Sequence, residues 1–477
     1  MYRRNPLLRT DSYKYSHWLQ YPPGTTMIES YIESRGAKHF GNMGMYFGLQ
    51  GFLKDHLMEP FTQADLDEAV EVTTGHFGTD KIFPAEGFKY ILKEYGGYWP
   101  VTIRSLDEGS YVPSGTPLVV VNSTDPKVPW VTSFLETALL RAVWAPTTSA
   151  TISFGILELI WQMLAETSDD PINELPFKLH DFGARGVSSS ESAGIAGAGH
   201  LINFRGSDNA EAIEWCRHLY DEPVAGYSIP AAEHSTITSW GPAGEADAYR
   251  NMLKQFGDGI VAVVSDSYDI FNAVEHIWGE ELQAEVTAMK GMLVVRPDSG
   301  DPCAVNQKLI KLLDEKFGHT VNSKGFKVLN HVRLIQGDGV STGVIRLILW
   351  KFRDAGYSAS NIAFGMGGAL LQHMDRDWLQ FAMKCNLIEV NGLRRPVSKN
   401  PIGDPEKNSK GGAIDVVLNG GEYTWVDRMF PGTFIGYPSV MKTRYHNGVL
   451  SNETTLAEIR QRVGLKLIER SKVLAEA

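Results

Sequence analysis

The segment IVAVVSDSYD (260–269) decides the fold class, because five apolar residues in a row are followed at once by small and acidic ones. A strand that is apolar on both faces is typical of a parallel sheet covered by helices. Five further segments repeat the pattern, with starts about 30–50 residues apart, the length of a strand, a helix and two loops. They are PFKLHDFGARG (176–186), VAGYSIPAAEH (224–234), GMLVVRPDSG (291–300), HVRLIQGDG (331–339) and NIAFGMGG (361–368).

The segments between these runs are predicted to be helices. In the segment 269–278, Ile270, Val274 and Ile277 fall on one face at helical spacing, and residues 344–352 have the same pattern. Each predicted strand also ends in a polar cluster. An open doubly wound sheet would concentrate such clusters at one or two loops, so we predict an irregular parallel (β/α) barrel instead.

The two ends of the chain have a different pattern from the middle. A chain of 477 residues is longer than one hydrophobic core usually serves. We predict a barrel-like catalytic domain over 146–389 and a second, mixed α+β domain formed from both chain ends, 1–145 and 390–477. The first end mixes strand-like pieces (27–34, 101–104, 117–121) with a helical one (61–74), and the second alternates like short antiparallel strands.

The overall charge restricts the class of partner. The net charge is −11 and the isoelectric point is near 5.7, which argues against nucleic acid or an anionic membrane as the main partner. Cys216, Cys303 and Cys385 are far apart and form no C-x-x-C motif, so neither a disulfide framework nor a zinc site is expected. No signal peptide or apolar run long enough to span a bilayer is recognised, and we predict a cytoplasmic protein.

Two arginines stand at predicted strand ends and suit a phosphate group. Arg185 lies between glycines in DFGARG, and Arg296 opens RPDSG. The planar guanidinium gives paired charge-assisted hydrogen bonds, and glycine lets backbone N–H groups approach an anion. The alternative is that each arginine merely pairs with a neighbouring aspartate, Asp181 or Asp298.

Two glycine-rich loops follow the last two predicted strands, Gly337–Gly339 and Gly365–Gly368. In α/β barrels this position frequently holds a phosphate against backbone amides. The glycines are also compatible with simple tight turns. The Walker A pattern is absent from the sequence, so a nucleotide would be held by other means.

His234 follows Glu233 at the end of another predicted strand. Such a histidine can be a general base, a metal ligand or a nucleophile toward phosphate. It can equally be a residue that begins a helix capped by Ser235 and Thr236. No second ligand lies at zincin spacing, so a metal held by protein side chains is not expected.

Acidic and aromatic residues complete the set of candidates. The carboxylates can accept hydrogen bonds from a carboxamide or a ribose, or bind Mg²⁺ through substrate phosphates. Phe182 and Tyr13 can stack on an aromatic ring, or can belong to the core. Together these residues predict a phosphate-rich substrate, and they leave open a glycosyl or phosphoryl transferase, an aldolase or an isomerase. The five aspartates are Asp181, Asp208, Asp266, Asp298 and Asp338.

Seven longer motifs stand out along the chain. They are TDSYKYSHWLQYPPGT (10–25), KLHDFGARGVSSSESAGIAGAGHLINFRGSDN (178–209), YSIPAAEHSTITSWG (227–241), VAVVSDSYDIFNAVEHIWGE (261–280), VVRPDSGDP (294–302), LIQGDGV (334–340) and FGMGGALLQHMDRD (364–377). In order and spacing, from about residue 10 to the C-terminus, the chain resembles the nicotinamide phosphoribosyltransferase family. Members of this family join nicotinamide to phosphoribosyl pyrophosphate, giving nicotinamide mononucleotide and pyrophosphate in NAD salvage.

The resemblance implies a homodimer with two active sites at the subunit interface. Phe182 and, from the other subunit, Tyr13 would sandwich the pyridine ring, and Asp208 would receive the carboxamide. Arg296 and Asp298 would hold the ribose and phosphate side, Arg185 would contact pyrophosphate, and Asp266 would lie near the sugar and metal. The 5′-phosphate would be surrounded by Gly337, Asp338, Gly367 and Gly368. Phosphates would be bound across the interface by Arg35, Arg376, Lys384 and Lys399.

The resemblance also assigns a role to His234, as a phosphorylated histidine. ATP hydrolysis there would be coupled to nucleotide formation, with Mg²⁺ held mainly by substrate phosphates. The implied catalytic set is completed by Glu233, Asp266, Arg296 and Asp298.

Two positions depart from the animal members of the family. Ala184 replaces a bulky aromatic residue and Ala262 replaces a serine, which leaves the width and polarity of the pocket open. The rival interpretations are a nicotinate phosphoribosyltransferase and a non-catalytic signalling protein on the same fold. Asp208 argues against the first, because a carboxylate facing another carboxylate is costly.

Overall fold

The computed structural model describes residues 4–36, 41–403 and 408–476. The chain divides into two compact units. Three of the five boundaries between them fall inside helices and the other two fall in loops, and none coincides with the predicted boundaries at 145 and 390. The first unit comprises Met1–Thr151, Trp215–Glu222 and Asp375–Gly464, and the second comprises Ile152–Glu214, Pro223–Met374 and Leu465–Ala477.

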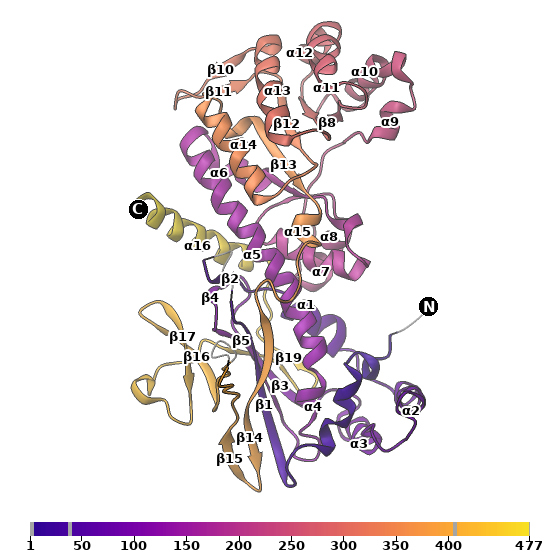
Figure 1. Cartoon of the computed structure of the whole chain (residues 1–477), viewed down its shortest axis with the longest axis vertical. Coiled ribbons are helices and arrows are strands. Elements are labelled where there is room, and N and C mark those ends of the chain that lie inside the picture. Colours follow the sequence, from indigo (N-terminus) through magenta and orange to yellow (C-terminus); the bar gives the residue numbers. More distant parts are fainter. Residues whose placement is uncertain (1–3, 37–40, 404–407, 477) are drawn as a thin grey trace. The chain divides into compact units, whose positions relative to one another are not determined.

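The first unit is built on an antiparallel sheet of seven strands in the order β15-β14-β1-β5-β3-β18-β19 (Figure 1). Strand β1 pairs with both β14 and β5, so residues more than 350 positions apart lie side by side. The strands are β1 (Thr25–Ser34), β2 (Met43–Met45), β3 (Val101–Ser105), β4 (Tyr111–Pro113), β5 (Pro117–Ser123), β14 (Phe381–Val390), β15 (Leu393–Pro396), β16 (Ile414–Asn419), β17 (Glu422–Asp427), β18 (Lys442–His446) and β19 (Val449–Leu450).

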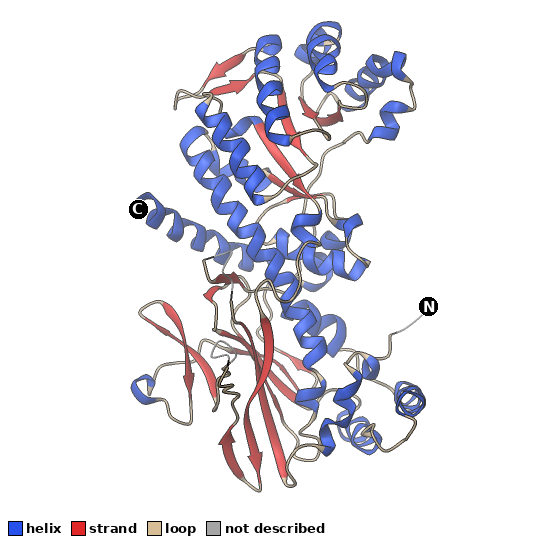
Figure 2. Cartoon of the chain, viewed as in Figure 1, coloured by secondary structure: helices blue, strands red, loops and turns tan. Residues whose placement is uncertain are grey.

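Helices complete the first unit, and the blue and red ribbons of Figure 2 distinguish them from the strands. Helix α2 has a capping box, in which the Thr62 and Asp65 side chains accept each other's backbone N–H. The helices are η1 (Pro6–Leu8), η2 (Ser12–Leu19), α1 (Leu49–Phe52), η4 (Leu53–Leu57), α2 (Gln63–Phe77), α3 (Ala85–Tyr95), α4 (Val131–Phe134) and η11 (Gly432–Phe434); α5 (Glu136–Thr167), α8 (Ala210–Leu219) and α16 (Leu456–Glu476) each contain a unit boundary.

Aromatic rings form the centre of the first unit's core. Trp99 and Phe134 stack with centroids 5.3 Å apart, and Phe88 meets Trp130 edge to face at 4.9 Å. These four side chains are at most 7% exposed. Large rings bury much apolar surface and prefer such offset or edge contacts, so the cluster stabilises the packing of α3 and α4 next to the sheet.

The second unit contains a curled parallel sheet of six strands in the order β7-β6-β13-β12-β9-β8. Its strands are β6 (Leu179–Asp181), β7 (Gly206–Ser207), β8 (Ile260–Val264), β9 (Met292–Arg296), β12 (Val332–Gln336) and β13 (Ile362–Met366), with a separate hairpin of β10 (His319–Val321) and β11 (Lys327–Leu329). Its helices are α6 (Pro171–Glu174), η5 (Leu175–Phe177), η6 (Ala184–Gly186), α7 (Ser190–Leu201), α9 (His234–Thr238), η7 (Pro242–Gly244), α10 (Glu245–Phe256), α11 (Ile270–Asn272), η8 (Ala273–Glu281), α12 (Gln283–Ala288), α13 (Pro302–Phe317), α14 (Thr342–Asp354), η9 (Ala359–Asn361) and α15 (Gly368–Leu371).

An irregular segment links the two edges of this curled sheet. Tyr227 bridges to Gly206 on β7, and Ala231 bridges to Ala262 on β8. Pro230 lies between the two bridges and has no N–H to donate, which prevents a regular strand here. The result is an irregular, incompletely hydrogen-bonded barrel.

The α/β fold class with a parallel barrel-like sheet is therefore confirmed. Five of the six predicted strands are present, at β6, β8, β9, β12 and β13. The prediction was wrong for VAGYSIPAAEH, which contributes only isolated bridges, and it missed the two-residue strand β7. A strand as short as β7 has too few residues to show a periodic pattern.

Helix α5 corrects another expectation from the sequence. By length and composition alone it is apolar enough to cross a membrane, although no such run was expected. Its most apolar window of 18 residues is 72% buried inside the protein. Burial of this extent is that of a core helix in a globular protein.

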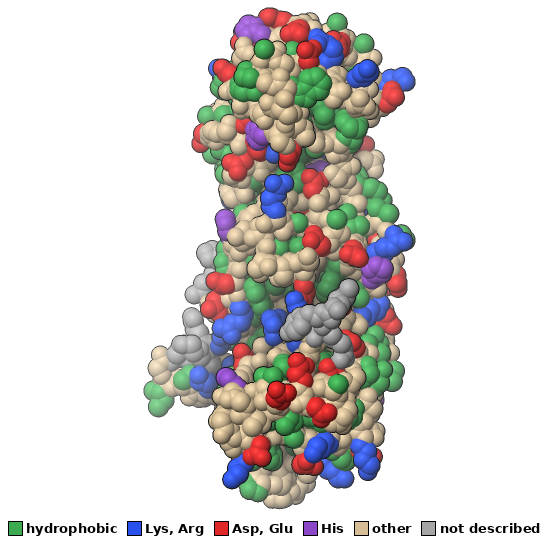
Figure 3. All heavy atoms as spheres, turned by 90° about the vertical axis from the view of Figure 1, so that its right-hand side faces the viewer, with side chains coloured by type: hydrophobic (Ala, Val, Ile, Leu, Met, Phe, Trp, Pro, Cys, Tyr) green, Lys and Arg blue, Asp and Glu red, His purple; other side chains and the backbone are tan. Residues whose placement is uncertain are grey.

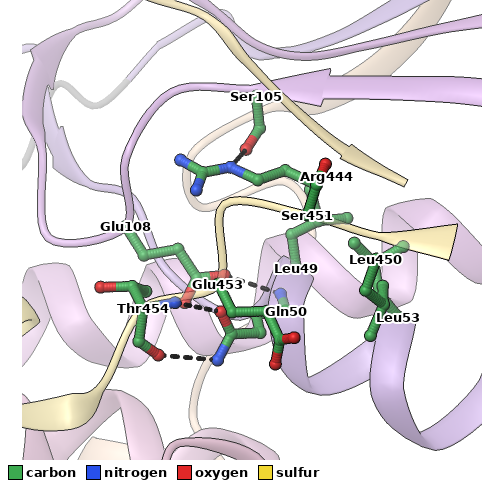
Figure 4. Close-up of a pocket in the computed structure, with 10 residues that line it drawn as sticks. All are labelled: Leu49, Gln50, Leu53, Ser105, Glu108, Arg444, Leu450, Ser451, Glu453 and Thr454. Atoms are coloured by element: carbon green, nitrogen blue, oxygen red, sulfur yellow. Dashed lines mark hydrogen bonds between the residues drawn. The ribbon is translucent and has the colours of Figure 1, made fainter. Parts of the chain in front are cut away.

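A small cavity of about 10 Å³ in the first unit contains a buried carboxyl group (Figure 4). Glu108 is 3% exposed, and its Oε1 accepts a hydrogen bond from the Gln50 N–H at 2.8 Å. Its Oε2 has no partner with hydrogen-bond geometry among the described residues. Burial raises the pKa of Glu108, while the Gln50 hydrogen bond and the Arg444 charge act in the opposite direction.

We predict that Glu108→Gln removes a pH-dependent loss of stability. Because the folded-state pKa is raised, the favourable contribution is complete below the unfolded pKa and is lost as the pH rises through the folded pKa. The variant should therefore melt at a higher temperature than the wild type at pH 8, and the two should converge near pH 4. Melting curves that stay parallel between these pH values would contradict the assignment.

Candidate active site

The parallel sheet brings the predicted strand-end residues of the second unit to one edge. Neighbouring strands pair Asp181 with Met366, Gln336 with Phe364, and Val264 with Arg296. Since the carboxyl ends of parallel strands meet at the same edge, the loops that follow them share one mouth. These loops carry Phe182, Asp208, Asp266, Arg296, Asp298, Gly337, Asp338, Gly367 and Gly368.

The Phe182 ring lies over a glycine at this mouth. A Cβ atom added to Gly365 would be 1.9 Å from Phe182 Cε2, and one added to Gly337 would be 3.3 Å from it. Phe182 also packs against the apolar interior formed by Ala262 and Val294. Gly365 is therefore required for the position of the ring, a role that the Gly-x-Gly-Gly pattern did not reveal.

Asp208 is exposed and is held from two sides. The Ser228 hydroxyl donates a hydrogen bond to Asp208 Oδ1. The Asp208 N–H donates to the Asp181 carbonyl at 3.0 Å. The second carboxylate oxygen remains available for a donor on a ligand.

Asp181 itself is buried behind this edge, and it is not paired with Arg185. Its Oδ1 accepts a hydrogen bond from the Gly183 N–H, and its Oδ2 accepts one from Asn209 Nδ2. Burial raises the pKa of Asp181 to about 6, against the effect of these hydrogen bonds, and the nearby Asp208 charge raises it further. Arg185 is exposed and has no ion-pair partner among the described residues, so its guanidinium is available to an anion.

Arg296 does form the aspartate pair that was considered as an alternative. Its Nε and Nη2 donate to the two oxygens of Asp298 at 3.2 and 2.9 Å. The Asp298 N–H and the Ser299 hydroxyl in turn donate to Asp266 Oδ2. This network fixes the fork of Arg296 at the mouth of the barrel, so the ion pair and a substrate contact are compatible.

His234 begins helix α9, and its ring faces two carboxylates. Its Nε2 lies 3.6 Å from Asp266 Oδ1 and 3.5 Å from Asp298 Oδ2. Its Nδ1 lies 3.2 Å from the Ser267 hydroxyl. Glu233 is exposed and its Oε1 accepts a hydrogen bond from the Ser235 hydroxyl, so it stands beside this group without contacting His234.

Asp266 offers an oxygen that suits a hard cation. Its side chain is 3% exposed, and Oδ1 has no hydrogen-bond partner among the described residues. Carboxylate oxygens are ligands that Mg²⁺ accepts in company with phosphate oxygens. In the part of the chain that the structure describes, no group of three or more His, Cys, Asp or Glu side chains is arranged as a metal site.

The loop after β12 is fixed by buried amide groups. Gln336 Nε2 donates to the Asp338 carbonyl at 2.7 Å, and Asn306 Nδ2 on α13 donates to Gln336 Oε1 at 2.6 Å. The Asp338 side chain is exposed, and the neighbouring loop after β13 leads from Gly367 into α15. Both loops thus present backbone at the barrel mouth, as an anion site requires.

The remaining predicted residues lie in the first unit, where four cationic side chains form a cluster. Burial lowers the pKa of Lys384 on β14, and the charges of Arg35, Lys399 and Arg376 lower it further, whereas Glu136 acts oppositely. A lysine with three further cations near enough to lower its pKa is suited to binding a polyanion. On the face drawn in Figure 3, acidic and basic side chains are interspersed.

Tyr13 also belongs to the first unit and is 57% exposed, in the 3₁₀ helix η2. Its ring meets His17 edge to face at 5.0 Å, and the Lys14 ammonium lies 5.1 Å from its centroid. It is therefore a surface aromatic rather than a core residue.

Comparison with known proteins identifies the family. A sequence model described as the nicotinate phosphoribosyltransferase (NAPRTase) family matches residues 177–458, and one described as the nicotinamide phosphoribosyltransferase N-terminal domain matches residues 5–103. This chain belongs to the nicotinate phosphoribosyltransferase family. It is accordingly a phosphoribosyltransferase, and the family resemblance predicted from the motifs is confirmed.

Three curated relatives of the chain share one name. A protein of Xanthomonas campestris pv. campestris, named nicotinamide phosphoribosyltransferase, is 49% identical over 96% of this chain and 98% of its own. Proteins with the same name from Acinetobacter baylyi and Mycoplasma pneumoniae are 31% and 32% identical, over 98% and 86% of this chain and 98% and 95% of their own.

Two solved structures share the fold of this chain. Nicotinate-nucleotide pyrophosphorylase from Pyrococcus furiosus superposes with a TM-score of 0.62 at 15% identity, over 98% of this chain and 97% of its own. Human nicotinic acid phosphoribosyltransferase superposes with a TM-score of 0.56 at 17% identity, over 96% of this chain and 93% of its own. At these identities the likeness concerns the fold alone.

The two positions that depart from animal family members lie close to the ring site. Ala262 packs in the barrel interior with Val294 and Ile335, and Ala184 lies two residues after Phe182 in the turn η6. Both are small, so they leave space around Phe182 that larger side chains would fill.

Sequence reasoning missed the residues that support the site from behind. Asn209, Ser228, Ser267 and Gln336 each hold a site residue or loop, as described above. One signal was available, because Asn209 is a small polar residue directly before a helix, where N-caps are found. The others act through contacts between segments distant in sequence, which no local pattern shows.

A second cavity, of about 700 Å³, was also missed, at the amino ends of the barrel strands. Lys178, Ile260, Met292, Arg333 and Ala363 are among its lining residues. Burial lowers the pKa of Lys178, and the Glu174 charge opposes this shift. The cavity lies at the end of the sheet opposite the predicted site.

We predict that Gly365→Ala displaces the Phe182 ring. The new methyl group overlaps the ring, and overpacking of this kind costs roughly 1–3 kcal/mol. Phosphoribosyl transfer should fall by about tenfold or more, as expected for a misplaced substrate-contacting group. Gly259→Ala is the matched control, because its Cβ would meet nothing within 4 Å. Equal effects of the two substitutions on melting temperature and activity would contradict this role of Gly365.

Proposed function

We propose that this phosphoribosyltransferase joins nicotinamide to 5-phosphoribosyl 1-pyrophosphate, releasing nicotinamide mononucleotide and pyrophosphate, as a step of NAD salvage. The observation that carries the proposal is the arrangement at the barrel mouth. Phe182 and Asp208 follow adjacent strands there, and the Arg296–Asp298 pair follows another strand of the same sheet. The names of the relatives at 49%, 32% and 31% identity support it.

In this proposal the pyridine ring stacks on Phe182 and its carboxamide binds Asp208. Ser228 occupies one carboxylate oxygen of Asp208, so the other accepts an N–H of the amide. A nicotinate ring would bring a second carboxylate to this position. The repulsion would disfavour nicotinate, which is the basis of the proposed selectivity.

The phosphoribosyl group would be held by the opposite side of the mouth. Arg296 and Asp298 bind the sugar and phosphate side, and the backbone of the loops at Gly337–Asp338 and Gly367–Gly368 surrounds the 5′-phosphate. Arg185, whose guanidinium has no ion-pair partner among the described residues, binds pyrophosphate.

The transfer itself passes through an oxocarbenium-like state, without a covalent sugar intermediate. The C1–oxygen bond to pyrophosphate breaks as the ring nitrogen of nicotinamide bonds to C1. The protein acts by positioning both reactants and by stabilising the departing pyrophosphate with Arg185 and Arg296. Asp266 and Asp298 are the carboxylates that would hold Mg²⁺ together with the substrate phosphates, and such an ion would neutralise part of the phosphate charge.

We further propose that His234 accepts a phosphoryl group from ATP. A ring nitrogen bonds to the γ-phosphorus as the bond to the departing ADP oxygen breaks, and water later hydrolyses the phosphohistidine. Its exposed position beside Asp266 and Asp298 supports access to both nucleotide and metal. Coupling this hydrolysis to transfer makes nucleotide formation more favourable.

The complete active site is proposed to form in a homodimer. Two features of the first unit would complete the partner's site. Tyr13 would contact the pyridine ring, and phosphate would be bound by the cationic cluster of Arg35, Arg376, Lys384 and Lys399. The exposure of Tyr13 and the mutual proximity of the four cations support this assignment. The three free cysteines support a cytoplasmic protein.

The main rival function is that of a nicotinate phosphoribosyltransferase. The family model has that description, and the names of two structural neighbours refer to nicotinic acid or to its nucleotide.

With both bases assayed side by side, the wild type should prefer nicotinamide by kcat/KM. Asp208→Asn should weaken that preference by roughly tenfold or more, since the carboxylate partner of the amide is lost. Equal use of both bases by the wild type contradicts the proposal, and no transfer to either would favour a non-catalytic protein.

For the coupled reaction, His234→Ala is expected to lose ATP hydrolysis while keeping slow transfer. The measurement is nucleotide formation with and without ATP and Mg²⁺, with ADP release followed in parallel. His276→Ala is the control, because that histidine is exposed and pairs only with Glu280 in the described structure. ATP stimulation that survives in His234→Ala would exclude the phosphohistidine.

A further inference from the structure

Asp181 and Asn209 form a fully buried polar pair behind the ring side of the candidate active site. Both residues are 0% exposed. Asn209 Nδ2 donates a hydrogen bond to Asp181 Oδ2 at 2.8 Å. Asp181 ends β6 directly before Phe182, and Asn209 directly follows Asp208. The pair therefore joins the two strand ends that carry both candidate contacts to the pyridine.

Asp181 holds these strand ends through its carbonyl oxygen and both carboxylate oxygens. Its carbonyl accepts the Asp208 N–H at 3.0 Å, and its Oδ1 accepts the Gly183 N–H at 2.7 Å. Its Oδ2 accepts the hydrogen bond from Asn209. Phe182, between Asp181 and Gly183, also donates its own N–H to the Met366 carbonyl at 3.1 Å. The backbone on both sides of the ring is thus fixed.

Asn209 uses both amide hydrogens and its carbonyl oxygen in the same network. Its Nδ2 also donates to the Ala193 carbonyl on α7 at 3.0 Å, and its Oδ1 accepts the Ala212 N–H on α8 at 3.2 Å. A side-chain amide has two donor hydrogens and one acceptor oxygen, and all are satisfied here. Fully satisfied buried networks rigidify their surroundings.

Helix α7 leaves this pair no space to rearrange. A Cβ atom added to Gly197 would lie 2.5 Å from Asn209 Nδ2 and 2.9 Å from Asp181 Oδ2. The helix backbone therefore packs directly on the pair. A change in either side chain has to be transmitted toward Phe182 and Asp208.

We propose that Asp181 and Asn209 are positioning residues that set the spacing between the Phe182 ring and the Asp208 carboxylate, and hence the affinity for the pyridine substrate. The inference rests on the proposed function, in which both of those residues contact the pyridine. Neither Asp181 nor Asn209 touches substrate, because both are buried beneath the strand ends. Misplacement of a contacting group by about 1 Å can cost on the order of a hundredfold in rate.

The main test is Asn209→Ser in the full-length enzyme. Serine keeps the N-cap of α8, but it is too short to reach Asp181. The KM for nicotinamide should rise by roughly tenfold, because a buried acceptor loses its partner. The KM for phosphoribosyl pyrophosphate should change little. If this variant does not fold, the same two KM values are measured for Asp181→Asn, in which the side chain keeps its shape and volume.

The matched control is Asn306→Ser, at the phosphate side of the same barrel. Asn306 is also 0% exposed and donates to a buried side chain, Gln336 Oε1, which supports the loop at Asp338. Its substitution should raise the KM for phosphoribosyl pyrophosphate and leave that for nicotinamide nearly unchanged. A general loss of stability cannot produce these opposite effects.

Exchange of the two groups provides a rescue. In Asp181→Asn/Asn209→Asp the amide donates to the carboxylate in the opposite direction, although the bond to Ala193 is lost. The KM for nicotinamide should return part of the way to the wild-type value. Equal increases in both KM values for Asn209→Ser, unchanged KM values with a lower melting temperature, or a double variant no better than Asp181→Asn would each overturn the proposal.

Failure of the proposed function is recognised separately, in the wild type. Before the variants are compared, the binding of nicotinamide and of nicotinate to the wild type is measured by calorimetry, and the turnover of both bases is assayed. If the wild type uses nicotinate as well as or better than nicotinamide, the proposed function is wrong, and the pair is then tested by the KM for nicotinate with the same expected selectivity. A wild type that binds neither pyridine overturns both proposals.

Discussion

The candidate site depends on the parallel register of the curled sheet. Backbone hydrogen bonds pair Asp181 with Met366, and further along the sheet they pair Val264 with Arg296. Because each strand runs in the same direction, every loop that follows a strand emerges at the same edge. Residues as far apart in sequence as Phe182 and Gly368 thereby lie at the same mouth of the barrel, because each directly follows or lies near the end of its own strand.

Small side chains set the space at that mouth. The Phe182 ring occupies the volume that a side chain at Gly365 would need, and Ala262 contributes little bulk to the interior beneath it. Protein interiors are packed tightly enough that one methyl group matters. The glycine-rich segment Gly365–Gly368 therefore has two parts, since Gly365 in β13 makes room for the ring, while Gly367 and Gly368 after the strand are the proposed backbone contacts of an anion.

Charge is organised locally, against a net charge of −11. Arg296 is tied to Asp298, and Asp298 to Asp266, so a cation and two carboxylates are fixed together beside His234. In the first unit, the charges of Arg35, Arg376 and Lys399 act on Lys384, so that cations outnumber the one carboxylate, Glu136, that also acts on it. The network of Arg296, Asp298 and Asp266 contains both signs of charge in a fixed arrangement, which suits a substrate group whose charge changes during the reaction. The cationic cluster suits an anion that stays bound during the whole reaction.

The sequence by itself determined the α/β class, five of the six predicted barrel strands and the residues at their ends, because buried parallel strands and strand-end polar clusters are local patterns. It also contained the motifs that identify the family. Only the tertiary structure decided that Tyr227–Ala232 links the sheet edges by isolated bridges, and that Phe182 lies over Gly365. It also decided that Asp181 pairs with Asn209 and not with Arg185. These contacts join residues on different strands and loops, so their distances follow from register and packing, which no local sequence pattern records.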